Sequence, residues 1–242
     1  MPETEREVAK TEEPRKVEPN LATMIRFKLW NIPISIHWTF FLLTAFLGGA
    51  LGAANIYDWH RVLAFMVAAL LSVLVHELGH SLTGLRMGAA SNRIELHGFG
   101  GTSSFPEARF SRMNSILVTV AGPAASILLA GVVYAILVGV SPMLSRDYYP
   151  SALLLSFLTI MLWINVFWSV FNLFPILPLD GGRIVQAALG PQRLKLTCII
   201  SFIALAFLGV ILWALTQSIY NLILVAILAT VTWQTMQRST GR

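Results

Sequence analysis

The chain has 242 residues, of which 56% are hydrophobic and only 12% are charged, and its mean hydropathy is +0.70. Soluble domains carry about 25% charged residues, so this composition excludes an ordinary soluble domain and predicts a polytopic membrane protein. The net charge of +5 does not indicate a nucleic-acid partner, because the basic residues lie between apolar runs. The single cysteine, Cys198, excludes an intrachain disulfide.

The first 24 residues are rich in Glu, Lys, Arg and Pro and poor in apolar side chains. Such a segment cannot bury enough apolar surface to fold alone, so we expect a disordered cytoplasmic tail over residues 1–24. We expect residues 25–242 to form a membrane-embedded domain. The stretch from Leu29 to Trp38, which carries Pro33 and His37, is expected to lead into the membrane at its interface.

Six apolar stretches are each about as long as the roughly 20 residues that a helix needs to span a bilayer. Two prolines interrupt the fourth stretch, and a short polar turn separates the fifth from the sixth. We therefore predict an all-α polytopic membrane protein with about six transmembrane helices. The approximate ranges are 38–57, 62–85, 113–140, 151–177, 196–216 and 219–236.

The basic residues outside these stretches predict the orientation. Of the 17 Lys and Arg, all but Arg61 and Arg146 lie in the tail, the C-terminal end and the alternate loops on one side of the predicted membrane. Cytoplasmic loops carry an excess of basic residues, so we predict a multi-pass protein of the cell membrane with both termini cytoplasmic.

The second apolar stretch contains the motif His76-Glu77-Leu78-Gly79-His80. On a helix, His76 and His80 share one face with the spacing that two imidazoles need to bind zinc, and Glu77 is placed to act as a general base. A helix rises about 1.5 Å per residue, so His80 lies about 9 Å and His76 about 15 Å from Arg86 at the cytoplasmic end. Ionisable groups at this depth usually mark function. Two structural histidines with Glu77 as their partner remain the alternative.

A glycine-rich segment, Ile94-Glu95-Leu96-His97-Gly98-Phe99-Gly100-Gly101, lies between the second and third stretches. Its glycines exclude a stable helix and predict a short β or re-entrant segment with close backbone approach. Exposed strand edges are not tolerated in lipid, so the segment must be buried in protein or line a wet cavity. A plain cytoplasmic loop is the alternative. His97 could bind a metal by residue type, but we favour a structural role for it.

The third stretch contains Ala121-Gly122-Pro123, whose small residues indicate close helix packing and to which we assign no chemistry. The fourth stretch ends with Asn172-Leu173-Phe174-Pro175, which is followed by Pro178 and Leu179-Asp180-Gly181-Gly182. The prolines break the helix before Asp180, on the same side of the membrane as the histidines. Two histidines and one carboxylate leave a fourth tetrahedral position for water, as in a catalytic zinc site. A helix-capping or turn aspartate is the alternative for Asp180.

Together these motifs resemble the site-2 protease family of intramembrane zinc metalloproteases. The resemblance extends over most of residues 30 to 190, and the glycine-rich segment and the Ala-Gly-Pro segment are similar to further landmarks of the family. It implies that His76, His80 and Asp180 bind one Zn2+ per chain, and that Glu77 is the catalytic acid and base.

The resemblance also implies that Asn172 lies near the scissile bond. A transmembrane substrate must unwind before hydrolysis, because its amides are hydrogen-bonded within its own helix. We expect the glycine-rich segment to bind the unwound substrate as an added strand, with Gly100 and Gly101 allowing the two backbones to approach closely.

The predicted function is therefore zinc-dependent hydrolysis of a peptide bond within or near the transmembrane segment of a membrane-protein substrate, in the lipid bilayer. A zinc transporter is one alternative. It should place its ligands near the midplane and show repeat symmetry between its halves, and this sequence shows neither feature. A catalytically silent binder of transmembrane segments is the other alternative, and it would have no use for Glu77.

Overall fold

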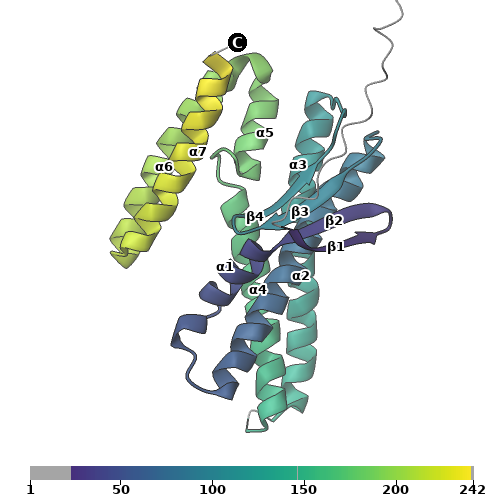
Figure 1. Cartoon of the computed structure of the whole chain (residues 1–242), viewed down its shortest axis with the longest axis vertical. Coiled ribbons are helices and arrows are strands. Elements are labelled where there is room, and N and C mark those ends of the chain that lie inside the picture. The colour runs from purple at the N-terminus through teal and green to yellow at the C-terminus, as the bar shows by residue number, and fades with distance from the viewer. Residues whose placement is uncertain (1–22, 146, 241–242) are drawn as a thin grey trace, which may run out of the picture.

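The computed structural model describes residues 23–145 and 147–240 and is mostly helical, with one small sheet (Figure 1). Most of the expected disordered tail lies outside the described residues, but Thr23 and Met24 already belong to the first strand. The helices are α1 (Trp38–Leu47), α2 (Ile56–Arg86), α3 (Arg112–Val140), α4 (Tyr149–Asn172), α5 (Asp180–Leu189), α6 (Leu194–Thr216) and α7 (Ile219–Thr240). Three short 3-10 turns cover Ala50–Gly52, Ser141–Met143 and Pro191–Arg193.

Four helices of the described chain are long and apolar enough to cross a membrane, namely α2, α3 with its extension to Met143, α4 and α6. The first predicted span is not one continuous helix. Its α1 has 10 residues and ends at Leu47, and Gly49 takes a φ of 91°, so the helix does not continue. Ten residues rise about 15 Å, roughly half of the hydrocarbon core. The six-span topology also requires α1 and α7 to cross the membrane, and this part of it stays a prediction.

The prediction of an all-α fold is wrong, because the mostly helical chain also contains a four-stranded sheet. Its strands are β1 (Thr23–Leu29), β2 (Ile32–His37), β3 (Arg93–His97) and β4 (Gly100–Ser104), in the order β1-β2-β3-β4. The β1–β2 and β3–β4 pairs are antiparallel, and β2 and β3 are parallel. The stretch that was expected to lead into the membrane is therefore strand β2. The glycine-rich segment, for which we predicted a short β or re-entrant structure, lies in the antiparallel β3–β4 hairpin.

The sheet buries one face against the helices. Ile32, Ile34 and Ile36 alternate along β2 and are at most 3% exposed, because successive side chains of a strand point to opposite faces. They form one core with Ile94 and Leu96 of β3 and with residues of α1 and α2. This packing holds β3 and β4 beside α2, and β4 is an edge strand of the sheet.

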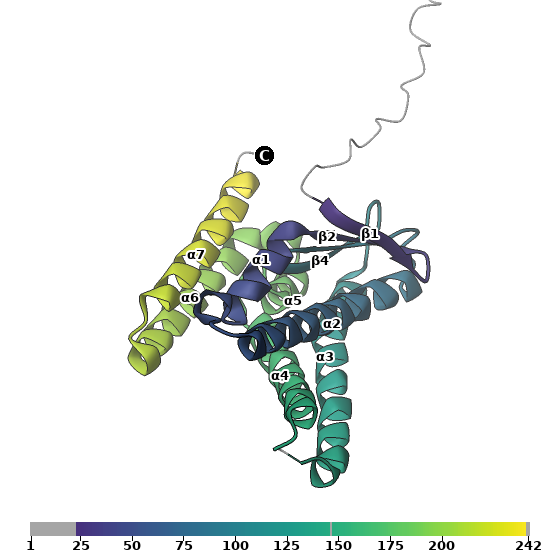
Figure 2. The ribbon, with the colours of Figure 1, turned by 60° about the horizontal axis from the view of Figure 1, so that its bottom comes forward.

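The remaining helices form two groups. The helices α2, α3 and α4 share a core that includes Ala68, Val133 and Met161. The helices α6 and α7 form a separate pair, which is joined to the rest through α5 and the segment before it (Figures 1 and 2). Ile176 of that segment is fully buried in the core of the α6–α7 pair, against Leu205 and Leu228.

Candidate metal centre

Helix α2 positions the two histidines and the glutamate of the motif. It begins at an Asn55–Asp58 capping box and runs without a break past His80. His76, Glu77 and His80 are all at most 6% exposed. The Nε2 atoms of the two histidines lie 3.2 Å apart, as expected for residues one turn apart whose rings converge on one point.

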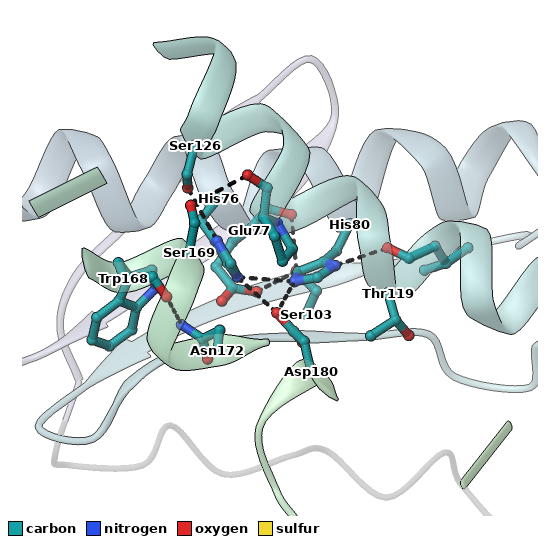
Figure 3. Close-up of polar contacts among 12 residues, drawn as sticks. His76, Glu77, His80, Ser103, Thr119, Ser126, Trp168, Ser169, Asn172 and Asp180 are labelled. Carbon is teal, nitrogen blue, oxygen red and sulfur yellow. Dashed lines mark hydrogen bonds and ion pairs between the residues drawn. The ribbon is translucent and has the colours of Figure 1, made fainter. Parts of the chain in front are cut away.

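Asp180 reaches the same point from the first residue of α5. The chain between α4 and α5 turns back, so that a residue 104 positions from His76 lies beside it. The Asp180 Oδ2 atom lies 3.0 Å from His76 Nε2 and 3.3 Å from His80 Nε2 (Figure 3). The structure thus brings together the three ligands that the sequence predicts. Within the described chain, they are the group of His, Cys, Asp and Glu that could hold a metal ion.

The geometry of this group fits a zinc ion. Metal–ligand distances of about 2.0 Å in a tetrahedral site place neighbouring ligand atoms about 3.3 Å apart, close to the spacing observed here. His80 Nδ1 lies 2.8 Å from the carbonyl oxygen of Val118. A carbonyl oxygen only accepts hydrogen bonds, so Nδ1 carries the proton and Nε2 presents a lone pair to a metal. Ser126 Oγ lies 3.1 Å from His76 Nδ1 and orients the other ring.

Helix α3 contributes more to this centre than its sequence indicated. A Cβ atom on Gly122 would overlap the imidazole of His80, so only glycine lets α3 approach the ring this closely. The sequence predicts only close packing for the Ala121-Gly122-Pro123 segment and does not indicate the contacts that Val118 and Ser126 make with the histidines. In the sequence, only the presence of a glycine within an apolar helical stretch indicates that another group approaches α3 closely there.

Glu77 points from α2 toward β4. Ser103 Oγ lies 2.7 Å from Glu77 Oε2 and 3.0 Å from the Glu77 carbonyl oxygen, so the hydroxyl holds the carboxylate against the strand (Figure 3). A Cβ atom on Gly101 would lie 2.5 Å from Glu77 Cγ. Gly101 therefore makes room for the glutamate, and its contact with a substrate stays a prediction.

The other two residues predicted to bind substrate both lie next to Trp168. Asn172 Nδ2 donates to the Trp168 carbonyl oxygen at 2.8 Å. Gly100 has a φ of 114°, and a Cβ atom there would lie 2.8 Å from the Trp168 ring. The same ring lies edge-on to His76 at 6.5 Å between centroids. Trp168, for which the sequence predicts no role, therefore connects β4 with the metal centre.

The remaining histidines have other partners. His97 Nδ1 accepts a hydrogen bond from the Phe99 amide at 3.1 Å, within the β3–β4 turn. Burial and the neighbouring His37 lower the pKa of His97, so its ring is neutral at pH 7. His60 Nδ1 lies 2.8 Å from the Tyr149 hydroxyl. His37 is the cap residue before α1. These positions agree with structural roles.

A sequence comparison with known families decides the assignment. The model of Peptidase family M50 matches residues 64–149 and 143–211, which contain every residue of the metal centre. The chain belongs to peptidase family M50. Together with its four apolar helices, this membership makes it a multi-pass membrane protein.

Several proteins similar to this M50 chain are named as zinc metalloproteases. Zinc metalloprotease MJ0392 of Methanocaldococcus jannaschii is 31% identical over 166 residues, 69% of this chain and 45% of the relative. Putative zinc metalloprotease Rip3 of Mycobacterium tuberculosis is 27% identical over 165 residues, 64% of this chain and 41% of the relative. Putative zinc metalloprotease sll0528 of Synechocystis is 36% identical over 129 residues, 52% of this chain and 32% of the relative. The chain spans less than half the length of these relatives.

The M50 chain also resembles a solved structure, the site-2 protease from Methanocaldococcus jannaschii. The TM-score is 0.58 at 26% identity, and the match covers 87% of this chain and 94% of the other. The predicted membership of the site-2 protease family is confirmed. The zinc metalloprotease relatives and the His-His-Asp group together support zinc as the metal.

Proposed function

We propose that this chain is a zinc-dependent intramembrane endopeptidase, which hydrolyses a peptide bond within or near the transmembrane segment of a membrane-protein substrate. The observation that carries the proposal is the convergence of His76 Nε2, His80 Nε2 and Asp180 Oδ2 next to the buried carboxylate of Glu77. His76, Glu77 and His80 are held by α2, a helix long and apolar enough to cross a membrane, and Asp180 joins them from the start of α5. Their burial at membrane depth is costly and points to function.

The residues around the centre have distinct roles in this proposal. His76, His80 and Asp180 hold the metal, and a zinc ion there would supply a Lewis acid that polarises the substrate carbonyl and acidifies water. Glu77 accepts the proton of the attacking water and then donates it to the leaving amine. Ser103 keeps the Glu77 carboxylate in place through Oε2.

Edge strand β4 would present the substrate. Freeing a backbone amide or carbonyl from a membrane helix costs several kcal/mol unless it finds a new partner. A strand added along β4 supplies such partners, and β4 begins at Gly100 beside Trp168 and passes Glu77 at Gly101. An extended substrate on β4 would therefore lie close to the base. Asn172, at the end of α4, would contact the substrate near the scissile bond.

The proposed placement in the membrane follows from the basic loops. Both termini would be cytoplasmic, since fifteen of the 17 Lys and Arg lie on that side. The metal centre would then lie inside the membrane, nearer to its cytoplasmic face. Residues 25–242 would form the membrane-embedded protease domain, and the chain before strand β1 would lie on the cytoplasmic side.

Metal analysis coupled to a cleavage assay tests this proposal. The protein, purified in detergent, should contain one zinc per chain. After reconstitution with a substrate that has one transmembrane segment, a chelator should stop cleavage and added Zn2+ should restore it. His80→Ala should lose the metal, because two remaining ligands hold zinc poorly. Cleavage that continues at the same rate after complete removal of the metal would contradict the proposal.

A further inference from the structure

The backbone of Leu177 is held by hydroxyl groups from the last two long helices. Ser201 of α6 accepts a hydrogen bond from the Leu177 N–H at 3.1 Å. Thr232 of α7 donates to the Leu177 carbonyl oxygen at 2.7 Å. Ser201 and Thr232 are both fully buried. We call this arrangement of Ser201, Thr232 and the Leu177 backbone the Leu177 clamp.

The clamp satisfies groups that secondary structure leaves unpaired. Leu177 lies between α4 and α5, where the chain is not helical, and buried backbone groups in such a segment need partners. Both hydroxyls also contact their own helices, as helical Ser and Thr commonly do. Ser201 Oγ donates its proton to the Thr197 carbonyl oxygen at 2.9 Å and accepts the Leu177 N–H with a lone pair. Thr232 Oγ1 lies 2.9 Å from the Leu228 carbonyl oxygen, so its one proton is shared between that carbonyl and the closer carbonyl of Leu177.

Any displacement of Leu177 would be transmitted to Asp180. The Leu179 N–H donates to the Ile176 carbonyl oxygen at 2.8 Å, which closes the turn just before α5. A Cβ atom on Gly182 would lie 2.5 Å from the Leu177 nitrogen, so the first turn of α5 rests directly on this backbone. Asp180 is the first residue of that turn. The clamp therefore fixes a short, tightly packed unit that ends in a metal ligand.

We propose that Ser201 and Thr232 are positioning residues, which set the Asp180 carboxylate for the metal by holding Leu177. This inference rests on the proposed zinc site. A metal site requires its ligands to be held within about 0.5 Å of the productive geometry by surrounding contacts. Through the clamp, the α6–α7 pair supplies such contacts, although it contributes no ligand of its own. The affinity of the centre for metal thus depends on helices distant in sequence from the His-Glu motif.

Metal affinity of the full chain in detergent tests the clamp without any cleavage assay. We would measure Zn2+ affinity by competition with a chromogenic chelator, and the visible spectrum of the Co2+-substituted protein. Thr232→Val and Ser201→Ala should each weaken Zn2+ binding by about tenfold, because a metal site loses affinity on this scale when contacts that orient its ligands are removed. The Co2+ bands should shift in both variants, because the position of the carboxylate changes.

Two matched variants separate the clamp from the general loss of a hydroxyl. Thr230 of α7 and Thr197 of α6 donate to carbonyl oxygens of their own helices, at 2.7 Å and 3.4 Å. Thr230→Val and Thr197→Val should therefore bind Zn2+ as the wild type does. Thr232→Ser keeps the hydroxyl and should retain most of the affinity and the wild-type Co2+ spectrum.

Equal affinities and spectra for Thr232→Val, Ser201→Ala and their matched controls would overturn the clamp. A wild-type protein that binds neither Zn2+ nor Co2+ would instead overturn the proposed zinc site. Ser201→Ala carries the test alone if Thr232→Val yields no folded protein.

Discussion

The Ser103 hydroxyl lies 2.7 Å from the Oε2 atom of Glu77, so edge strand β4 and metal-centre helix α2 meet at the proposed general base. The sheet is therefore part of the proposed active site. Its position beside α2 comes from the alternating isoleucines of β2, which bury the sheet against the same helix. A strand that binds substrate would also hold the base that activates the attacking water.

Ser103→Ala should reduce kcat by about tenfold or more at unchanged zinc content, because a hydrogen bond to a charged group contributes about 1.5–3 kcal/mol. The exposed Ser104→Ala, at the end of the same strand, is the matched control and should cleave normally. Steady-state cleavage in proteoliposomes measures both. If Ser103→Ala keeps the wild-type kcat, the hydroxyl does not orient Glu77.

Gly100→Val should impair cleavage and leave the zinc content unchanged. Its side chain would separate β4 from an added strand and would press on Trp168, 2.8 Å from the new Cβ atom. A substrate with Gly or Pro near the cut should be affected less, because it unwinds more easily.

The Gly100 prediction needs a control for backbone strain, since a φ of 114° disfavours valine by itself. Gly88 has a φ of 96° with open space around its Cβ position, so Gly88→Val introduces comparable strain away from the centre. Cleavage of rigid and helix-broken substrates at wild-type rates by Gly100→Val would rule out strand addition on β4.

Gly122→Ala should weaken zinc binding by about 10-fold to 100-fold, because the new methyl group would displace the His80 ring from its position. Gly131→Ala changes a glycine of the same helix that has open space around it, and it should bind zinc normally. Chelator competition measures both affinities. Equal affinities would show that α3 does not constrain His80.

The sequence predicted the local part of the metal centre well and the contacts between elements poorly. Two histidines one turn apart on a helix must share a face, so His76 and His80 could be placed from their spacing. The prolines before Asp180 indicated a break in the helix. Gly122, Ser103 and Trp168 carry no such signal, because their contacts depend on how α3, β4 and α4 pack around α2.

The strand before α1 was missed for a different reason. Ile32, Ile34 and Ile36 alternate with Pro33 and Ser35, which is the period of a strand. The apolar content of the neighbouring stretch favoured a membrane lead-in instead. Glycines Gly48 and Gly49 also divide the first apolar stretch, and the count of apolar residues alone did not detect this break.

The predicted topology can be tested by cysteine labelling in intact cells. After Cys198 is replaced, single cysteines are introduced at Ser91 and Ser145, both of which are exposed. An impermeant reagent should label Ser145→Cys and should not label Ser91→Cys, because the basic loops place Ser91 in the cytoplasm. The reverse pattern would overturn the cytoplasmic assignment of the termini.

Glu77→Gln tests the account most directly, because it removes the proposed base and keeps the size of the side chain and all three metal ligands. We expect one zinc per chain, as in the wild type, and a rate of cleavage at least about 100-fold lower, since general acid–base catalysis contributes about 10²–10⁴-fold. Zinc analysis and cleavage of a transmembrane substrate on the same preparation measure both. A Glu77→Gln protein that holds zinc and cleaves at the wild-type rate would contradict the account.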